Sequence, residues 1–68
     1  MTFGEALAIA LERQEMKAAE LSERSGVSAS YISKLFSGRV KEPTWSKANA
    51  IIDALGITPS EFRKIQGI

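Results

Sequence analysis

The feature that most constrains the fold of this chain is a series of helix caps and glycines that divides it into short segments. Gly26, Gly38 and Gly56 each follow a run in which apolar residues recur three or four positions apart. Glycine readily adopts the left-handed backbone that ends a helix, so each of these positions predicts a helix terminus. No alternating strand pattern, internal repeat or sustained heptad is present. The sequence therefore predicts an all-α protein.

This arrangement of caps and glycines predicts five helices. Thr2 and Glu5 predict a capping box at the start of the first helix. Thr58 and Glu61 predict another at the start of the last, with Pro59 in its first turn. The expected helices run from this first cap to about Gln14, then over Lys17–Ser25, Ser28–Ser37 and Thr44–Leu55, with a short fifth helix after Thr58.

The apolar spacing also predicts which side of each helix is buried. In the fourth helix, Trp45 falls on one stripe with Ala48, Ile52 and Leu55, so we expect the tryptophan to anchor the core. The other expected inward residues are Phe3, Leu7, Ala10, Leu11, Ala18, Leu21, Ser22, Ile32, Leu35, Phe36, Phe62 and Ile65.

Composition narrows the classes of function. A chain of 68 residues predicts one domain over residues 1–68. It contains no cysteine and no histidine, so we expect no disulfide, no metal site and no cofactor. The apolar stretch Ala6–Leu11 is too short for a membrane span and lacks a basic flank before it. We therefore expect a cytoplasmic protein with no membrane partner and no small-molecule ligand.

Charge is unevenly distributed along the chain, although the net charge is only +1. Acidic residues outnumber basic ones over residues 1–27, and the reverse holds from Ser28 onward. The segment Ser28–Lys47 is the basic part, with Lys34, Arg39 and Lys41. A basic segment of this kind is typical of a surface that binds nucleic acid.

The segment Lys17–Gly38 has the pattern of two short helices joined by a turn that contains one glycine. Apolar contacts can hold these two helices together through Leu21, Val27, Ile32 and Leu35. The start and outer side of the helix after Ser28 would then remain uncovered, where they could enter the major groove of DNA.

The same segment and its flanks resemble the phage repressor and Cro-type helix-turn-helix family, also called Xre-like, over roughly Phe3 to Ile65. The resemblance implies a compact, five-helix, lambda-repressor-like fold. It also implies a sequence-specific transcriptional regulator of phage or prophage type that binds double-stranded DNA on the nucleoid, with repression favoured. The residues that carry it are Phe3-Gly4, Glu20-Leu21, Gly26-Val27-Ser28, Tyr31-Ile32-Ser33, Gly38, Pro43, Leu55-Gly56-Ile57 and Phe62.

By position, the resemblance assigns base reading to Ala29, Ser30, Ser33 and Lys34. Lysine can donate to guanine, a serine hydroxyl can serve either kind of base edge, and an alanine methyl can contact the methyl group of thymine. The phosphate contacts that the resemblance implies are Lys17, Ala18, Ser28, Tyr31, Arg39 and Lys41.

The sequence departs from the family pattern at three positions. Position 18 often carries glutamine in the family, and Ala18 lacks that side chain's hydrogen bond to phosphate. Leu11 and Phe36 occupy positions where relatives often have an arginine and a glutamate that pair. We expect an apolar contact to replace that ion pair here, because no charge then has to be desolvated.

A homodimer is the economical assembly, because two recognition helices one turn of DNA apart read a palindrome. The expected interface residues are Ile57, Pro59 and Ile68. A chain that is monomeric in solution and dimeric only on DNA remains an open alternative.

Other interpretations also remain open. Ser30 and Ser33 could be ordinary helix-surface serines, the basic residues a solvated edge, and Tyr31 a packing residue. The same fold could serve as a protein-interaction module, such as an antitoxin or an adaptor. An enzyme is not expected, because the chain shows no arrangement of a nucleophile and a base.

Overall fold

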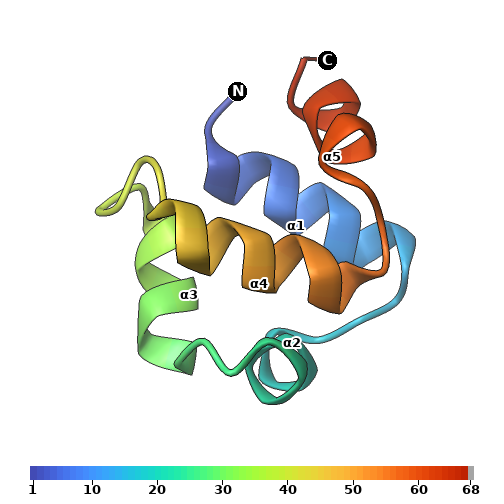
Figure 1. Cartoon of the computed structure of the whole chain (residues 1–68). Coiled ribbons are helices and arrows are strands. Elements are labelled where there is room, and N and C mark those ends of the chain that lie inside the picture. Colours follow the sequence, from blue (N-terminus) through green and yellow to red (C-terminus); the bar gives the residue numbers. More distant parts are fainter. Residues whose placement is uncertain (68) are drawn as a thin grey trace.

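The structure is a computed structural model that describes residues 1–67, and this range forms five α-helices without a strand (Figure 1). The first four helices begin and end within about one residue of their predicted bounds, and the fifth begins directly after Thr58 as predicted, so the all-α prediction is confirmed. None of the helices in this range is both long and apolar enough to cross a membrane. The helices are α1 (Phe3–Arg13), α2 (Ala18–Ser25), α3 (Ala29–Ser37), α4 (Trp45–Leu55) and α5 (Pro59–Gln66).

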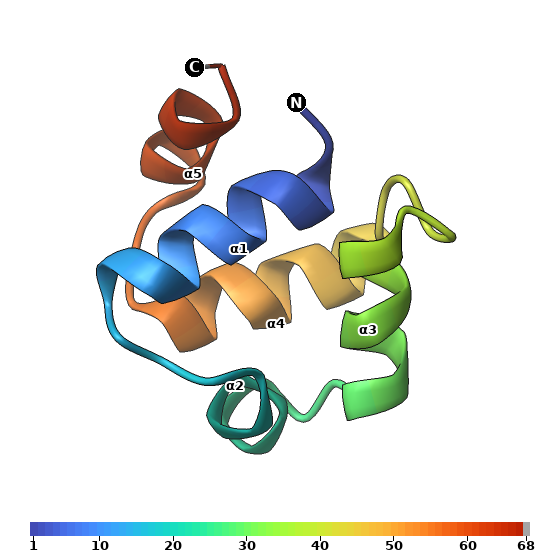
Figure 2. The same ribbon diagram turned by 180° about the vertical axis from the view of Figure 1, so that it is seen from behind.

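The helices pack as a cluster in which α1 contacts α3 and α5, and α4 contacts α2 and α5. The consecutive helices α2 and α3 also contact each other. In both views α3 lies at one edge of the molecule, so only its inner side meets the other helices (Figures 1 and 2).

The core consists of apolar side chains from all five helices and from the turn between α2 and α3. The Phe3 and Phe62 rings, from α1 and α5, lie with their centroids 4.6 Å apart. No polar or charged residue is buried in the described range. The buried apolar residues are Phe3, Ala6, Leu7, Ala10, Leu11, Leu21, Val27, Ile32, Leu35, Ile51, Ile52, Leu55, Phe62 and Ile65.

Gly4 allows α1 to approach the end of α3 more closely than any other residue would. A Cβ atom built on Gly4 would lie 1.9 Å from the carbonyl oxygen of Leu35. Because the obstacle is backbone, it cannot move aside as a flexible side chain would. The contact between these helices therefore fixes where α3 sits on the core.

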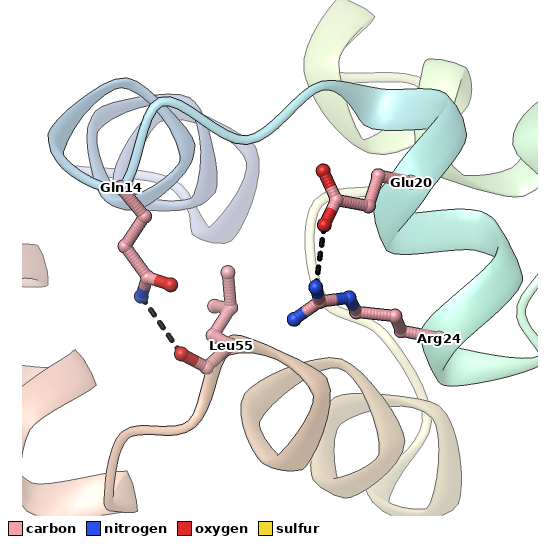
Figure 3. A network of polar contacts seen from close by, with 4 residues as sticks. All are labelled: Gln14, Glu20, Arg24 and Leu55. Atoms are coloured by element: carbon pink, nitrogen blue, oxygen red, sulfur yellow. Dashed lines mark hydrogen bonds and ion pairs between the residues drawn. The ribbon is translucent and has the colours of Figure 1, made fainter.

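Most helix termini are satisfied by the residues that the sequence predicts. The hydroxyl groups of Thr2, Ser28, Thr44 and Thr58 each accept a hydrogen bond from a backbone N–H in the first turn of a helix. Both capping boxes are present. At the other end of α4, the Gln14 side-chain Nε2 donates to the Leu55 carbonyl at 2.8 Å, which joins the end of α1 to the end of α4 (Figure 3).

Two of the predicted core residues, Trp45 and Phe36, are exposed. Trp45 is 80% exposed, so the prediction that it anchors the core is wrong. It is the first residue of α4, and the buried part of that helix is limited to Ile51, Ile52 and Leu55. Trp45 lies on the predicted side of α4, but no neighbouring element covers the first turn of this helix. Phe36, near the end of α3, also remains 39% exposed while Leu11 is buried.

Candidate nucleic-acid interface

The turn between α2 and α3 is held by side-chain hydroxyl groups. Gly26 ends α2 in the left-handed conformation, with φ of 74°. The Ser22 hydroxyl donates to the Val27 carbonyl at 2.7 Å, and the Ser25 hydroxyl accepts from the Val27 N–H at 3.1 Å. These two bonds fix Val27 from both sides, so the angle between α2 and α3 is set locally.

The inner side of this pair of helices is closed by the residues that the sequence predicts. Leu21 and Ile32 are fully buried, Leu35 is 1% exposed and Val27 is 6% exposed. The prediction that these side chains lock α2 to α3 is confirmed. The outer side of α3 is therefore held in a defined orientation by a packed layer beneath it.

The outer face of α3, which we define as Ala29, Ser30, Ser33 and Lys34, is exposed at every position. No hydrogen bond between side chains occupies these residues within residues 1–67. The sequence from Ser25 to Lys41 contains no aspartate or glutamate. The outer face thus offers hydroxyl groups, a methyl group and an ammonium group, with no carboxylate in its own stretch of chain to repel a polyanion.

The basic loop that follows α3 is tied to the end of the helix. Gly38 turns the chain with φ of 81°. The Val40 N–H then donates to the Lys34 carbonyl at 3.1 Å, and Val40 packs against the core. Arg39 and Lys41, on either side of Val40, are both exposed. Their cations therefore project from a loop whose backbone is anchored between them.

The first turn of α2 differs from that of the other helices. Its N-cap, Lys17, makes no side-chain capping hydrogen bond, so the backbone N–H groups there lack the partner that a hydroxyl supplies elsewhere. The Ala18 side chain is half-buried against the core, so Ala18 offers only its backbone N–H outward. Glu20, the acid in this turn, pairs with Arg24 at 2.7 Å, and that pair offsets its charge (Figure 3).

Lys47 lies beside Tyr31, although the sequence pattern indicates no role for it. Its Nζ lies 4.8 Å from the centroid of the Tyr31 ring, which is half-buried against the core. Lys47, Ser28 and Tyr31 line one groove of about 440 Å³ that has no acidic residue in its lining. One signal could have found it, because Lys47 lies one turn before Ile51 on the buried side of α4.

Of the three residues predicted at a dimer interface, the structure describes Ile57 and Pro59, and these two line different hollows. Ile57 is half-buried against the core and lines a pocket between α1 and α5, beside Ala10 and Ile65. Pro59 is exposed and lines a different groove, which also contains Trp45. Ile68 lies outside the described residues.

The comparisons with known proteins give one match. A protein-family model described as a helix-turn-helix domain matches residues 2–65. No curated protein matches the chain, and no solved structure does. The matched range contains α1 to α4 and most of α5, so it includes the whole scaffold that supports the outer face of α3.

Proposed function

Since this chain belongs to the helix-turn-helix domain family, we propose that it is a sequence-specific regulator of transcription that binds double-stranded DNA through α3. In this proposal it is a repressor of the phage repressor and Cro type and binds a palindromic operator as a homodimer. Residues 1–68 act as one DNA-binding domain. The family is typically non-enzymatic, and the chemistry of the site is that of binding.

The observation that carries this proposal is the exposure of the outer face of α3. Ser30 and Lys34 would be unable to reach a base if another part of the chain covered them, and both are exposed. An α-helix supported only from behind fits the major groove, which is about 12 Å wide. The inner side of α3 is closed by Ile32 and Leu35, so the helix can present its outer face without moving.

Each residue of the outer face has a base edge that suits it. Lys34 donates to O6 and N7 of guanine, and the Ala29 methyl contacts the methyl group of thymine. The hydroxyl groups of Ser30 and Ser33 donate to or accept from base edges. Together they would discriminate among base pairs at a few adjacent positions, and the second copy would repeat this reading in the other half-site.

Phosphate contacts surround that face in the proposal. Lys17, Arg39 and Lys41 neutralise phosphates, and the uncapped N-terminus of α2 donates backbone hydrogen bonds to one of them. Ser28 and Tyr31 also contribute. We add Lys47 to this set, because it lines the same groove as Ser28 and Tyr31.

The test of this proposal is selection of bound sequences from a random DNA pool. The wild type should enrich one symmetric site, and Lys34→Ala and Ser30→Ala should each relax the preference at particular base pairs. Loss of a good base contact costs about 1–3 kcal/mol of discrimination. Lys64→Ala, at an exposed lysine of α5, is the matched control and should select the wild-type site. Unchanged preferences in both α3 variants would contradict the base-reading assignments.

A protein-interaction module is the second candidate, and the exposed Trp45 favours it. The dependence of affinity on salt separates the two. DNA binding predicts an affinity that falls steeply as ionic strength rises, because each neutralised phosphate releases counterions. Removing one phosphate contact with Arg39→Ala should flatten the slope of log K against log salt by about 0.9. A partner protein would not produce that slope.

A further inference from the structure

A groove lies beside the first turn of α4, on a part of the surface that the proposed DNA interface does not use. It has a volume of about 410 Å³, within the size range of pockets that accept drug-sized molecules. Its apolar lining combines core residues of three helices with more exposed residues on the rim. The apolar lining residues are Phe3, Pro43, Trp45, Ala48, Ile52, Pro59 and Phe62. We call this surface the Trp45 groove.

The exposure of Trp45 marks this surface as an interface. The side chain is 80% exposed, whereas Phe3, Ile52 and Phe62, which line the same groove, are at most 7% exposed. A partner that covers both a large aromatic ring and the apolar hollow beside it removes apolar surface from water, and this lowers the free energy of the complex. Tryptophan is also among the residue types that most often dominate the energy of protein interfaces.

The charges on the groove indicate which partner covers it. Its lining contains one acidic residue, Glu42, and one basic residue, Arg63. Neither forms an ion pair in the part of the chain that the structure describes, where the only ion pair joins Glu20 and Arg24. A surface with one unpaired charge of each sign can pair with a copy of itself, because a two-fold axis that passes between the two charges brings each of them opposite the other.

We propose that the Trp45 groove is the surface through which two copies of this chain associate. Trp45 of each copy enters the groove of the other, and Glu42 of each copy faces Arg63 of the other. This inference rests on the homodimer of the proposed function and names its interface. Of the interface residues predicted from the sequence, it includes Pro59 and leaves out Ile57.

The position of the groove is compatible with DNA binding. None of its lining residues belongs to the outer face of α3 or to the predicted phosphate contacts. The lining includes Glu42 and Pro43, which lie just before α4. The loop to α4 leaves the C-terminal end of α3, whereas the outer face starts at Ala29, at the opposite end of that helix (Figure 1). Association through the groove would therefore leave both copies of α3 free to read DNA.

The association should be weak in free solution. A groove centred on one side chain buries less than the roughly 800 Å² per partner of a standard stable interface. We therefore expect a dissociation constant in the range of about 0.1–1 mM without DNA. DNA with two half-sites would then hold two copies together at a far higher effective concentration.

The first experiment uses the intrinsic fluorescence of the protein, since Trp45 is its only tryptophan. Emission is measured from about 1 µM to about 2 mM protein without DNA, alongside sedimentation equilibrium. Dimerisation through the groove should shift the emission of Trp45 to shorter wavelengths and protect it from iodide over the same concentrations at which the mass doubles. A mass that doubles while Trp45 remains as accessible to iodide would place the dimer interface elsewhere.

The second experiment removes the ring. Trp45→Ala should weaken dimerisation by about 30-fold, the effect expected of a dominant interface residue, so the variant should be largely monomeric in sedimentation equilibrium up to about 2 mM. Phe36→Ala removes another exposed aromatic ring, one outside the groove, and is the matched control that should dimerise like the wild type. Circular dichroism melts establish that both variants fold. Equal dimerisation of Trp45→Ala and wild type would overturn the proposal.

The third experiment tests the charge pairing. Glu42→Arg and Arg63→Glu should each fail to self-associate, because like charges then face each other across the two-fold axis. A mixture of the two variants should recover dimers, since both facing pairs become opposite in sign. Lys64→Glu, on the same helix but outside the groove, should associate like the wild type. A mixture that stays monomeric would contradict the pairing of Glu42 with Arg63.

Failure of this inference and failure of DNA binding give different results. Self-association is measured without DNA, and binding of one chain to a single half-site needs no dimer. A wild type that remains monomeric up to about 2 mM, with unchanged Trp45 emission, would exclude a second copy as the occupant and leave DNA binding untouched. Absence of salt-dependent DNA binding would remove the proposed function while leaving a dimer through the groove intact.

Discussion

The two sides of α3 have opposite properties although they belong to the same nine-residue helix. The inner side carries Ile32 and Leu35, which are at most 1% exposed, and the backbone of Gly4 lies directly against its end. The outer face carries exposed small polar residues and Lys34. The inner side supplies stability, and the outer face is left available for a partner.

This difference means that the two roles should be separable by mutation. Changes on the inner side or in the helices that support it should lower the free energy of unfolding and leave base preference unaltered. Changes around the outer face should alter DNA binding and leave stability nearly constant. Single substitutions in the two groups of residues should reveal that separation.

Gly4→Ala should have the largest effect. The added Cβ would lie 1.9 Å from the Leu35 carbonyl oxygen, so α1 and α3 must move apart. Overpacking of this kind costs about 3 kcal/mol, which for a domain of this size lowers Tm by more than about 10 °C. Thermal melts followed by circular dichroism measure the change.

The matched control for that variant is Gly67→Ala. A Cβ atom there would have its nearest contact at 3.4 Å, and Gly67 has an ordinary φ of −82°. Its Tm should stay close to that of the wild type. If the two alanine variants melted at the same temperature, the close approach of α1 to α3 would not contribute to stability as we describe.

Leu11→Ala should have the next largest effect on stability. Leu11 is 6% exposed in the core, and truncation of a buried leucine costs about 2–3 kcal/mol at such a site. Because Leu11 lies on α1 and not on the outer face, the variant should keep the base preference of the wild type when assayed below its Tm. Thermal melts measure the loss of stability, and binding to variant DNA sites measures the base preference. An altered base preference would contradict the separation between residues that stabilise the fold and residues that bind DNA.

Lys47→Met tests a residue that belongs to both sides, since its ammonium group lies 4.8 Å from the centroid of the half-buried Tyr31 ring and Lys47 also lines a groove with Ser28. Methionine keeps an apolar stem and removes the charge. The slope of log K against log salt should become shallower by about 0.9, with a loss of stability of no more than about 1 kcal/mol. Lys64→Met, remote from this groove, should leave the slope unchanged. A wild-type slope in Lys47→Met would remove Lys47 from the interface.

Glu5→Gln should have the smallest effect and should appear only as a function of pH. The backbone N–H of Thr2 donates to the Glu5 carboxylate at 2.9 Å, and this bond lowers the pKa of Glu5. A lowered pKa means that the ionised form adds stability above the pKa of the unfolded chain, and that this stability is lost as pH falls through the folded-state pKa.

The measurement is the difference in Tm between wild type and Glu5→Gln from pH 7 down to about pH 3. Glutamine can still accept the capping hydrogen bond but does not titrate. The wild type should therefore lose more stability than the variant as the solution is acidified. Parallel curves would show that the capping box of α1 makes no pH-dependent contribution.

Much of the fold could be predicted because the signals are local. A cap such as Ser28 or Thr44 satisfies a backbone group three residues away, and Gly26 ends α2 through its own φ angle. Such interactions depend only on neighbours in the sequence. For the same reason, the helical spacing of Leu21, Ile32 and Leu35 was enough to separate the inner side of the motif from its outer face.

The sequence could not predict the surroundings of residues whose burial depends on where a neighbouring helix ends. Trp45 lies on the predicted side of α4, but periodicity gives a direction around the helix axis and says nothing about whether another element extends far enough to cover that turn. The placement of Lys47 over Tyr31 has the same origin, since it requires the relative position of α4 and α3.

The helices, their ends and their apolar sides follow from interactions between residues about four positions apart or less, so the amino-acid sequence was enough to predict them. Three other features become apparent only once the helices are packed: Gly4 lies against the backbone of α3, Lys47 lines the groove beside Ser28, and Trp45 remains in water. These facts depend on the lengths and crossing positions of helices that are distant in sequence. The packing of the helices in three dimensions determines these features, and no local sequence pattern predicts that packing.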